Sequence, residues 1–332
     1  MNSMFRVGLV GCGGIAHVHA AVLKELEETE FAACADIRPE RALQFKKDFG
    51  CAAYISLEEM LNHQHLDAVH LCTPHYLHPM MAAQLATRGV AVFTEKPPAI
   101  DVPGWNAVLE AARRVPVGIC FQNRYNANAL ACQRILDQAE YGALRGIRAF
   151  VTWNRSAGYY TSTDWKGKWS TEGGGALINQ AIHTLDLVIR FLGRPDQLES
   201  TMRNHHLSGV VEVEDTAEIW MRRGDVTALI YASTAYAADV PVLLELQFEK
   251  AAVRLENDSL IVLDDRGQTV IPCHMDASLG RSYWGAGHKS CIQDFYRSLQ
   301  TGQPYLNRPE TCRDTMDALL EIYRQNRSSL GS

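Results

Sequence analysis

Short apolar runs alternate with stretches of helical spacing over the first 122 residues of the chain. Buried strands are predicted at residues 5–11, 31–36, 52–56, 66–74, 90–97 and 115–122. Between them, the spacing of apolar side chains predicts helices near 18–26, 39–49, 57–62, 76–88 and 101–114. Strands that alternate with helices in this way form a parallel sheet covered by helices on both faces. The pattern therefore predicts a doubly wound α/β domain over residues 1–122.

Beyond residue 122 the pattern changes to β-rich runs with few helices between them. These runs lie at 144–153, 216–222, 227–234, 243–249, 251–256 and 259–264, and turn sequences such as RRGD (222–225) and DDRG (264–267) separate several of them. We expect them to form an antiparallel sheet by successive pairing, in a second domain over residues 123–332. One face would cover the domain's own helices, and the other, with exposed apolar and aromatic residues, would pair with a second subunit.

The composition is that of a soluble globular protein with a sizeable core, at 47% hydrophobic and 21% charged residues. A net charge of −6 and the lack of a long basic run argue against nucleic acid or an anionic membrane as a partner. No apolar run reaches the roughly 18 residues of a membrane span, and the N-terminal stretch becomes glycine-rich too early for a signal peptide. Nine cysteines without a CxxC pair are typical of reduced thiols, so we expect a cytoplasmic protein.

The junction between the first strand and the first helix reads GCGGIA, a GxGxxA pattern. In such a junction the glycines make a tight turn and let the backbone approach a pyrophosphate, and the small last residue lets helix and strand pack closely. The N-terminus of the helix supplies N–H groups to the phosphates. A glycine-rich turn without a ligand is the alternative, but the strand before it and the helix after it favour a dinucleotide site. The predicted contacts are Gly11, Gly13, Gly14, Ile15 and Ala16.

Asp36 closes the second predicted strand roughly 20 residues after the glycines, where an acidic residue accepts hydrogen bonds from the adenosine ribose. With its neighbour Ile37 it is assigned to the cofactor site. A carboxylate there repels a 2′-phosphate and favours NAD over NADP. Arg38 leaves NADP open, because a guanidinium can hold that phosphate. Asp36 could alternatively be a turn residue before Pro39.

Further segments carry the pattern of a known family. CTPHYLH (72–78), TEKPPA (94–99), GGGALINQAIH (173–183) and GHKSCIQDFYRSLQTGQPY (287–305), together with GCGGIAHVHA and ADIRPE, resemble the Gfo/Idh/MocA oxidoreductases over nearly the whole chain. The resemblance implies an N-terminal Rossmann domain and a C-terminal α/β domain with an open, mostly antiparallel sheet. It also implies a nicotinamide cofactor, a sugar, inositol or related polyol as substrate, and a homodimer or homotetramer formed through the sheet.

By this resemblance Lys96 is the active-site lysine, at the carboxyl end of a predicted parallel strand where ligands gather. A lysine there would hold the reacting oxygen and stabilise alkoxide character. Glu95 would lie against the nicotinamide, and Pro97 would shape a turn that is often cis in the family. The segment beneath the cofactor corresponds to Thr73, Pro74, His75 and His78. The two histidines lack a completing acidic or cysteine ligand, so no metal site is predicted.

Two further groups resemble cofactor contacts of the family. Gln122 and Arg124 follow the last Rossmann strand and resemble residues that approach the nicotinamide. Trp165 and Lys166 resemble a Trp-Arg pair near the cofactor. Lysine in place of arginine puts a bidentate contact in doubt.

A helix is predicted from residue 176 to residue 192, with one apolar face and a polar stripe of Asn179, His183, Asp186 and Arg190 on the other side. A polar stripe is usually a solvated face. The preceding triple glycine, which would let substrate approach the backbone, and the match to the family's GGGxLxDxGxHxxD pattern favour a catalytic face instead. Many family members carry Asp at position 179. An amide cannot take a proton, so we assign substrate orientation to Asn179 and acid/base work to His183.

The Asn-Gln-x-x-His version of this motif resembles the subgroup that oxidises pyranosides or nucleotide-linked sugars at the C3 hydroxyl. Aromatic faces pack against pyranose rings, and an arginine could bind a carboxylate or phosphate on the substrate. The candidates are Trp153, Arg155, Tyr159, Tyr160 and Tyr283. Each could instead pack in the core or at a subunit interface.

The main hypothesis is an NAD-dependent sugar dehydrogenase. One alternative keeps the fold but recycles a tightly bound NAD within a turnover that oxidises, eliminates or hydrolyses, and then reduces. Another is a non-catalytic regulator that senses sugar and NAD, which the presence of Lys96 and His183 disfavours and Asn179 mildly favours. The sequence leaves open the sugar, its attached group, the direction of the reaction and the oligomeric state.

Overall fold

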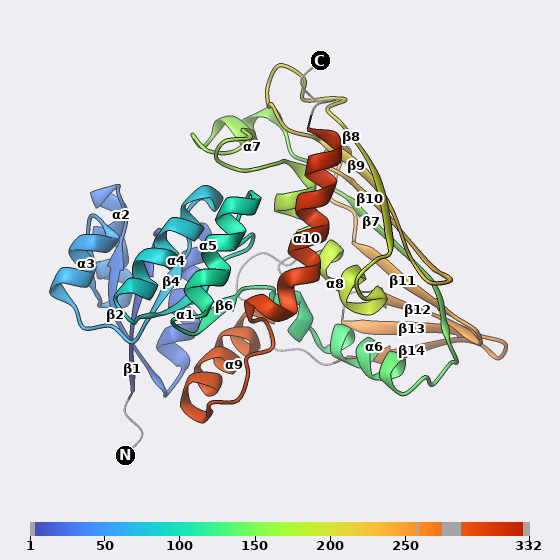
Figure 1. Cartoon of the computed structure of the whole chain (residues 1–332), viewed down its shortest axis with the longest axis horizontal. Helices are drawn as coiled ribbons and strands as arrows, with labels where there is room; N and C mark the ends of the chain where they lie inside the picture. The colour runs from blue at the N-terminus through green and yellow to red at the C-terminus, as the bar shows by residue number, and fades with distance from the viewer. Residues whose placement is uncertain (1–3, 257, 274–286, 328–332) are drawn as a thin grey trace. The chain divides into compact units, whose positions relative to one another are not determined.

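The computed structural model of the chain describes residues 4–256, 258–273 and 287–327 (Figure 1). The chain divides into two compact units. Unit 1 comprises Met1–Gln122 and Ser278–Cys312, and unit 2 comprises Asn123–Ala277 and Arg313–Ser332. The first break falls after residue 122. Residues 287–312, however, belong with unit 1, whereas the pattern placed them in the second domain.

Unit 1 is built on a parallel sheet of six strands in the order β3-β2-β1-β4-β5-β6. The strands are β1 (Phe5–Val10), β2 (Thr29–Ala35), β3 (Ala52–Tyr54), β4 (Ala68–Leu71), β5 (Ala91–Thr94) and β6 (Val117–Ile119). Every neighbouring pair is parallel, so the predicted doubly wound sheet is confirmed. The strand order reverses direction at β1, and ligands of open α/β sheets bind beyond the carboxyl ends of the strands at such a switch point.

The helices of unit 1 follow the predicted ranges closely. They are α1 (Gly14–Glu25), α2 (Pro39–Phe49), α3 (Leu57–His63), the 3₁₀ turn η1 (His75–Leu77), α4 (His78–Thr87) and α5 (Val102–Ala112). Ser56 and Asp101 cap α3 and α5 by accepting a backbone N–H in the first turn. The predicted strands 66–74, 90–97 and 115–122 are longer than the observed ones. Their buried residues continue past the last ladder bonds into the turns that carry site residues.

Helix α9 (Gly287–Thr301) explains why unit 1 is discontinuous in sequence. It packs against α1, and it buries Phe295 beside Phe93 of β5 with ring centroids 5.2 Å apart. The segment after it then extends the edge of the sheet. The carbonyl of Asn307 accepts the N–H of Ile119 at 3.0 Å, and the Asn307 side chain donates to the carbonyl of Phe121 at 2.9 Å. Unit 1 therefore acquires both a covering helix and an edge from a late part of the chain.

Unit 2 holds a sheet of eight strands in the order β14-β13-β12-β11-β7-β10-β9-β8. The strands are β7 (Leu144–Thr152), β8 (Gln197–Arg203), β9 (Thr216–Arg223), β10 (Val226–Ser233), β11 (Leu243–Phe248), β12 (Ala251–Glu256), β13 (Ser259–Asp264) and β14 (Gly267–Pro272). Successive pairing was wrong at two places, β7 with β9 and β10 with β11, because β7 lies between β10 and β11 and runs parallel to β10. All other neighbours are antiparallel, so the predicted mostly antiparallel sheet is confirmed. The pattern missed β8 and β14, which lack a strong apolar alternation.

The helical elements of unit 2 are α6 (Ala127–Asp137), the short α7 (Ala157–Thr161), the π-helical turn η3 (Ala176–Ala181), α8 (Ile182–Leu192) and most of α10 (Pro309–Asn326). Of these, α6 and α8 lie against one face of the sheet (Figure 1). Helix α6 packs on β12 and β13, and α8 packs on β7 and β10. The other face exposes apolar side chains, with Phe150 42% and Leu229 52% exposed. The single helix predicted over 176–192 is thus divided, because its first turns are π-helical.

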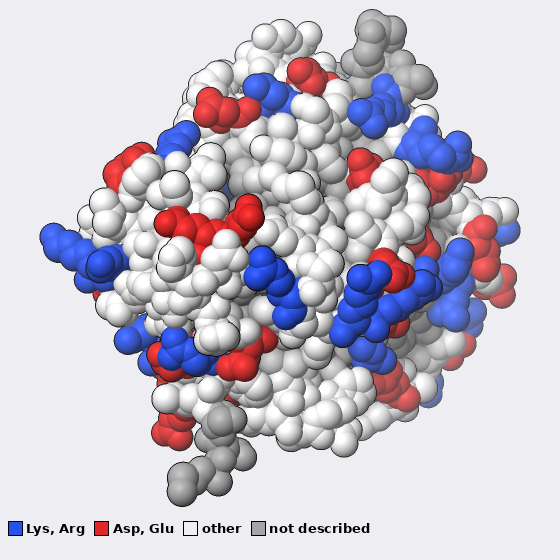
Figure 2. All heavy atoms as spheres, turned by 60° about the vertical axis from the view of Figure 1, so that its left-hand side comes forward, with Lys and Arg blue, Asp and Glu red and all other residues white. Residues whose placement is uncertain are grey.

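The surface is of mixed charge. Figure 2 shows Lys and Arg side chains interspersed with Asp and Glu over the face in view. No helix in the described part of the chain is both long and apolar enough to cross a bilayer.

Candidate active site

The turn between β1 and α1 has the geometry that a dinucleotide phosphate needs. Gly11 has a φ of +90°, and a Cβ there would lie 2.6 Å from the carbonyl oxygen of Cys72, so only glycine fits. At Gly13 and Gly14 an added Cβ would meet nothing within 4 Å. Helix α1 has no side-chain cap and no acidic residue in its first turn. Its first N–H groups are therefore available to an anion, and the residues present fit a pyrophosphate.

Asp36 braces this turn as well as offering an acceptor. Its Oδ2 accepts the N–H of Cys12 and its Oδ1 accepts the N–H of Arg38, both at 2.8 Å. A carboxylate has about four lone-pair positions, so each oxygen can accept a further bond from a ribose hydroxyl. Ile37 beside it is 87% exposed.

The segments CTPHYLH and TEKPPA meet through His78. Its Nδ1 lies 2.8 Å from the carbonyl oxygen of Pro97, and its Nε2 lies 2.9 Å from that of Thr73. Burial lowers the pKa of His78, so a neutral ring donates one of these two bonds at a time. The Lys96–Pro97 peptide is cis, as the family resemblance implied. His78 thus ties the two loops together through backbone carbonyls.

Glu95 is a buried carboxylate next to the half-buried Lys96. Its Oε2 accepts the backbone N–H of Lys96 at 3.2 Å, and its Oε1 lies 2.9 Å from Nε2 of His19. Burial alone raises the pKa of Glu95, but the hydrogen bond from His19 and the neighbouring positive charges outweigh burial and hold this pKa well below its usual range. Glu95 is therefore ionised and fixes the backbone of the lysine at the end of β5.

A buried chain of hydrogen bonds continues from Glu95 into unit 1. Nδ1 of His19 lies 2.8 Å from Nδ1 of His70, and Nε2 of His70 lies 2.8 Å from the hydroxyl of Tyr296. Since Glu95 only accepts, Nε2 of His19 donates to it. Nδ1 of His19 then accepts from Nδ1 of His70, and Nε2 of His70 accepts from the Tyr296 hydroxyl. We call Glu95, His19, His70 and Tyr296 the buried relay.

The buried relay joins α1, β4, β5 and α9, and sequence reasoning missed three of its members. Burial lowers the pKa of His70 and raises that of Tyr296, so both are neutral near pH 7. A signal for His19 was available, because it lies among buried positions of α1 where an amphipathic pattern calls for an apolar residue.

Among the described residues, His19, Glu95 and Cys120 have ligand atoms within 4.8 Å of one another. Both ring nitrogens of His19 already have partners in the buried relay. Burial, with the charge of Glu95 nearby, raises the pKa of Cys120 well above its usual value, and a protonated thiol is a poor metal ligand. The arrangement is that of a hydrogen-bonded support for Glu95.

In unit 2, Asn179 of η3 lies in a polar cluster. Its Nδ2 donates to Oε1 of Glu172 at 2.5 Å and approaches the hydroxyl of Tyr159 at 3.4 Å. Nε2 of Gln180 donates to the same hydroxyl at 3.2 Å, and Nζ of Lys166 lies 3.7 Å from the centroid of the Tyr159 ring. Three predicted site residues, Asn179, Tyr159 and Lys166, thus come together. Sequence reasoning missed Glu172, whose signal is an acid directly before the glycine run.

Two of the three glycines at 173–175 are required for a reason other than the predicted one. A Cβ at Gly174 would lie 2.1 Å from the hydroxyl of Tyr323, and one at Gly175 would lie 2.0 Å from the carbonyl oxygen of Glu214. These two glycines let the buried Glu214 and Tyr323 approach the backbone, so the prediction that the whole run opens the backbone to substrate was wrong for them. The space is filled by protein.

Glu214 holds the start of η3 in place. Its carboxylate accepts the N–H groups of Gly175 at 2.9 Å and Leu177 at 3.0 Å, and it accepts the Tyr323 hydroxyl at 2.8 Å. Burial raises the pKa of Glu214 to about 7 against these bonds, and burial likewise raises that of Glu172 to about 7. Two carboxyls with pKa values near neutrality therefore lie beneath the segment that carries Asn179, and such perturbed groups cluster at functional sites.

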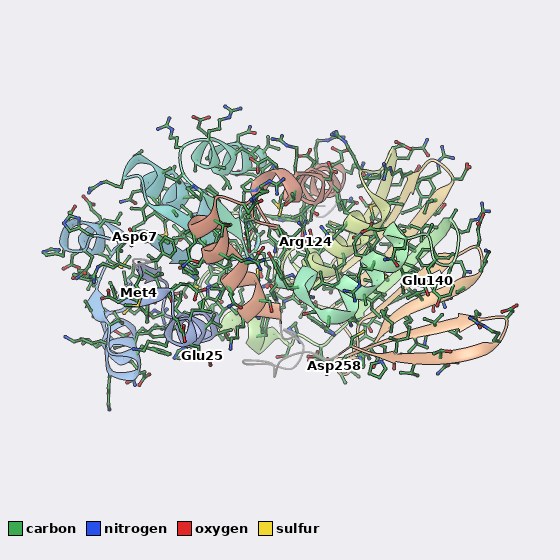
Figure 3. All side chains as sticks on the ribbon, turned by 90° about the horizontal axis from the view of Figure 1, so that it is seen from below. Met4, Glu25, Asp67, Arg124, Glu140 and Asp258 are labelled. Atoms are coloured by element: carbon green, nitrogen blue, oxygen red, sulfur yellow. The ribbon has the colours of Figure 1, made fainter. Side chains whose placement is uncertain are left out.

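The remaining polar positions of the helix differ from one another. His183 is half-buried in the first turn of α8. Asp186 is buried, and its oxygens accept Nε of Arg124 at 2.7 Å, Nη2 of Arg124 at 2.5 Å and the hydroxyl of Thr315 at 2.7 Å (Arg124 is labelled in Figure 3). The solvated-face alternative is therefore wrong for Asp186. The carboxylate holds the guanidinium of Arg124, and a cofactor contact for Arg124 stays a prediction.

The predicted sugar-binding residues fall into two groups, one buried in packing and one beside Asn179. Tyr160 packs in a buried cluster with Leu207, Val211 and Val213. Trp153 is buried and donates Nε1 to the carbonyl of Val240 at 3.1 Å. For these two the core-packing alternative applies.

The guanidinium of Arg155 lies 5.4 Å from the ring centroid of Tyr159, which also contacts Asn179. Its Nη1 lies 2.9 Å from Oδ1 of Asp239. It therefore remains beside a predicted site residue. Tyr283 lies outside the described residues. Trp165 and Gln122 are half-buried and buried respectively, and their cofactor contacts also stay predictions.

A parallel sheet with an anion-binding glycine turn and an acid after β2 defines a Rossmann dinucleotide-binding protein, here with a second unit built on an eight-stranded sheet. The family model described as an oxidoreductase family with an NAD-binding Rossmann fold, Gfo/Idh/MocA, matches residues 5–121. The model of the Gfo/Idh/MocA C-terminal domain matches residues 129–254. The chain belongs to the Gfo/Idh/MocA family.

Curated proteins that are similar in sequence to this chain include sugar dehydrogenases. The chain is 25% identical over 226 residues to the glucose-6-phosphate 3-dehydrogenase of Bacillus subtilis (strain 168), covering 65% of this chain and 64% of the relative. It is 30% identical over 207 residues to the D-glucoside 3-dehydrogenase of Escherichia coli (strain K12), covering 58% and 56%. The matches thus span less than two thirds of either relative.

Among solved structures, the WlbA dehydrogenase from Bordetella pertussis, in complex with NADH and UDP-GlcNAcA, is similar in fold. Its TM-score is 0.85 at 24% identity, and the match covers 98% of this chain and 97% of that one. The match therefore supports the same fold for both units of the chain.

Proposed function

We propose that this protein is an NAD-dependent dehydrogenase or reductase that acts on a secondary hydroxyl of a sugar, at C3 of a pyranoside or nucleotide-linked sugar. One observation carries the proposal. Two of the curated relatives are named for different glucose derivatives, yet both are named as 3-dehydrogenases. The shared position of oxidation, rather than the attached group, is what we transfer to this chain.

NAD, when bound along the glycine turn, would accept the hydride of the oxidised carbon. The role of Lys96 is to donate from Nζ to the reacting oxygen and stabilise the negative charge that develops on it. Glu95 serves that role indirectly, because its ionised carboxylate binds the backbone of Lys96. His183 takes the hydroxyl proton, and Asn179 orients the substrate.

The preference for NAD is supported by Asp36. Its carboxylate is held at the end of β2 by two backbone N–H groups. A 2′-phosphate would bring a second negative charge against it, whereas a ribose hydroxyl can donate to it.

We also propose that two copies associate through the uncovered face of the eight-stranded sheet of unit 2. Exposed Phe150 and Leu229 lie on the neighbouring central strands β7 and β10, facing away from the helices. A cytoplasmic location is proposed from the nine cysteines, all of which are buried free thiols.

The test is an assay of nicotinamide absorbance with NAD and, separately, NADP across free sugars, glycosides, sugar acids, inositols and nucleotide sugars. Mass spectrometry of the same mixtures should show a product two hydrogens lighter with a pyranoside or nucleotide sugar. Lys96→Met should abolish turnover and keep NAD binding, while the exposed Lys47→Met should behave as wild type.

Altered sugar without net nicotinamide reduction would instead establish a recycled cofactor. Binding of NAD with no altered sugar anywhere on the panel would leave a substrate outside the panel or a sensor, and ligand-binding screens would distinguish the two. Full activity of Lys96→Met would overturn the assignment of the lysine.

A further inference from the structure

Asn179 is held by a buried acid that the proposed reaction does not use. Glu172 is 0% exposed. Its Oε1 accepts Nδ2 of Asn179 at 2.5 Å, and its Oε2 accepts the N–H of Gly167. Both carboxylate oxygens are therefore engaged, one by the backbone and one by the amide.

The chemistry of the Glu172 carboxylate decides which edge of the Asn179 amide faces it. A side-chain amide has a donor edge, the NH₂ group, and an acceptor edge, the oxygen. An ionised carboxylate can only accept, so Glu172 binds the NH₂ group of Asn179. The same nitrogen, Nδ2, also approaches the hydroxyl of Tyr159. The oxygen Oδ1 is then the edge turned away from Glu172.

We propose that Glu172 is a positioning residue that locks Asn179 into presenting its oxygen, so that the amide accepts a hydrogen bond from a substrate hydroxyl as an aspartate would. This inference deepens the proposed function and rests on it. Many family members carry a carboxylate at position 179. In this chain the carboxylate is at position 172 instead, buried behind the Asn179 amide that it binds. Asn179 needs no charge of its own to act as an acceptor.

The lock depends on protonation. A protonated Glu172 becomes a donor, and its proton would attract the Asn179 oxygen and invert the amide. Burial raises the pKa of Glu172 to about 7, Lys166 opposes this increase, and Glu214 adds to it. Among the described residues, the titratable groups that act on Glu172 include Lys166, Glu214, Tyr160 and Tyr323, and Tyr159 contacts its partner Asn179. The acceptor form of Asn179 exists above the pKa of Glu172, so the KM for sugar should rise as the pH falls through about 7.

The test exchanges the two groups. In Glu172→Gln the second amide can turn either edge toward Asn179, so the lock is lost. In Asn179→Asp two carboxyls lie at hydrogen-bond distance and cannot both ionise. In the double variant the new amide at position 172 can accept from Gly167 with its oxygen and donate with its nitrogen to the new carboxylate at position 179. Every bond is then restored with the amide and the acid exchanged. Glu140→Gln, exposed in the turn before β7 (labelled in Figure 3), is the matched control.

We expect the KM for sugar to rise about tenfold in each single variant and to return to within about threefold of wild type in the double variant, which corresponds to about 1.4 kcal/mol of lost binding per single change. The affinity for NAD should stay constant throughout. The rise of KM below pH 7 should disappear in Glu172→Gln. A merely structural role for Glu172 would lower the urea midpoint without changing the pH profile of KM.

The outcomes separate this inference from the proposed function. A Glu172→Gln variant with the wild-type KM and pH profile, or a double variant no better than the worse single one, overturns the lock. Urea unfolding of the four proteins measures the pairing without any substrate. Midpoints that fall in both single variants and recover in the double one, with no sugar turned over by any of them, would overturn the proposed function and leave the pairing intact. Independent, additive midpoints would overturn the inference.

Discussion

At the residue scale, Asp36 braces the turn that would hold the cofactor. Its two oxygens accept N–H groups from Cys12 and Arg38. Asparagine has a single acceptor oxygen and no charge, so Asp36→Asn keeps at most one of these two bonds, and that bond is no longer charge-assisted. We expect the KM for NAD to rise about tenfold and the preference to shift toward NADP, since each such bond contributes about 1.5–3 kcal/mol.

Steady-state kinetics with both cofactors measure this effect. Asp48→Asn is the control, because that exposed carboxylate meets only the side chain of Gln44 one turn away among the bonds described. Unchanged cofactor kinetics in Asp36→Asn would contradict the assignment of the acid.

At the element scale, the buried relay connects four elements that are far apart in sequence. Tyr296 of α9 donates to His70 of β4, and His70 contacts His19 of α1, which in turn contacts Glu95. Tyr296→Phe removes the hydroxyl and leaves Nε2 of His70 without its relay partner in an apolar setting. We expect a loss of about 1–3 kcal/mol in the free energy of unfolding, the usual cost of an unsatisfied buried polar group.

Urea unfolding followed by circular dichroism checks this prediction. Tyr76→Phe is the matched control, because that side chain is exposed and its hydroxyl can bond to water. Equal stability of the two variants would show that the buried relay contributes nothing to the fold.

At the scale of the whole molecule, the Rossmann unit is completed by a late part of the chain. Phe295 of α9 is buried beside Phe93 and Tyr305, and Gly118 of β6 leaves the space that its ring occupies. Phe295→Ala would leave a cavity in unit 1 at a cost of about 3–5 kcal/mol. We therefore expect NAD binding to fall together with stability.

Thermal unfolding with and without NAD measures both effects. Leu43→Ala, at an exposed position of α2, should change neither. If Phe295→Ala bound NAD as the wild type does and unfolded at the same temperature, the late segment would not support the cofactor unit.

The sequence by itself determined the elements whose signals are local. The alternation of apolar runs and helical spacing predicted the parallel sheet, because β strands and helices differ in the period at which they bury side chains. Gly11, Asp36 and Lys96 could be placed because each follows a strand, and the carboxyl ends of parallel strands share one edge. The Asn179–His183 spacing could be recognised for the same local reason.

Only the tertiary structure decided which distant groups meet. Glu172 contacts Asn179 across a glycine run and a π-helical turn, Glu214 reaches Gly175 from before β9, and Tyr296 reaches His70 from α9. A one-dimensional pattern records how often a side chain is buried and not what it is buried against. Whether a buried acid is ionised, and which edge of an amide it selects, depends on the desolvation and the partners that folding alone supplies.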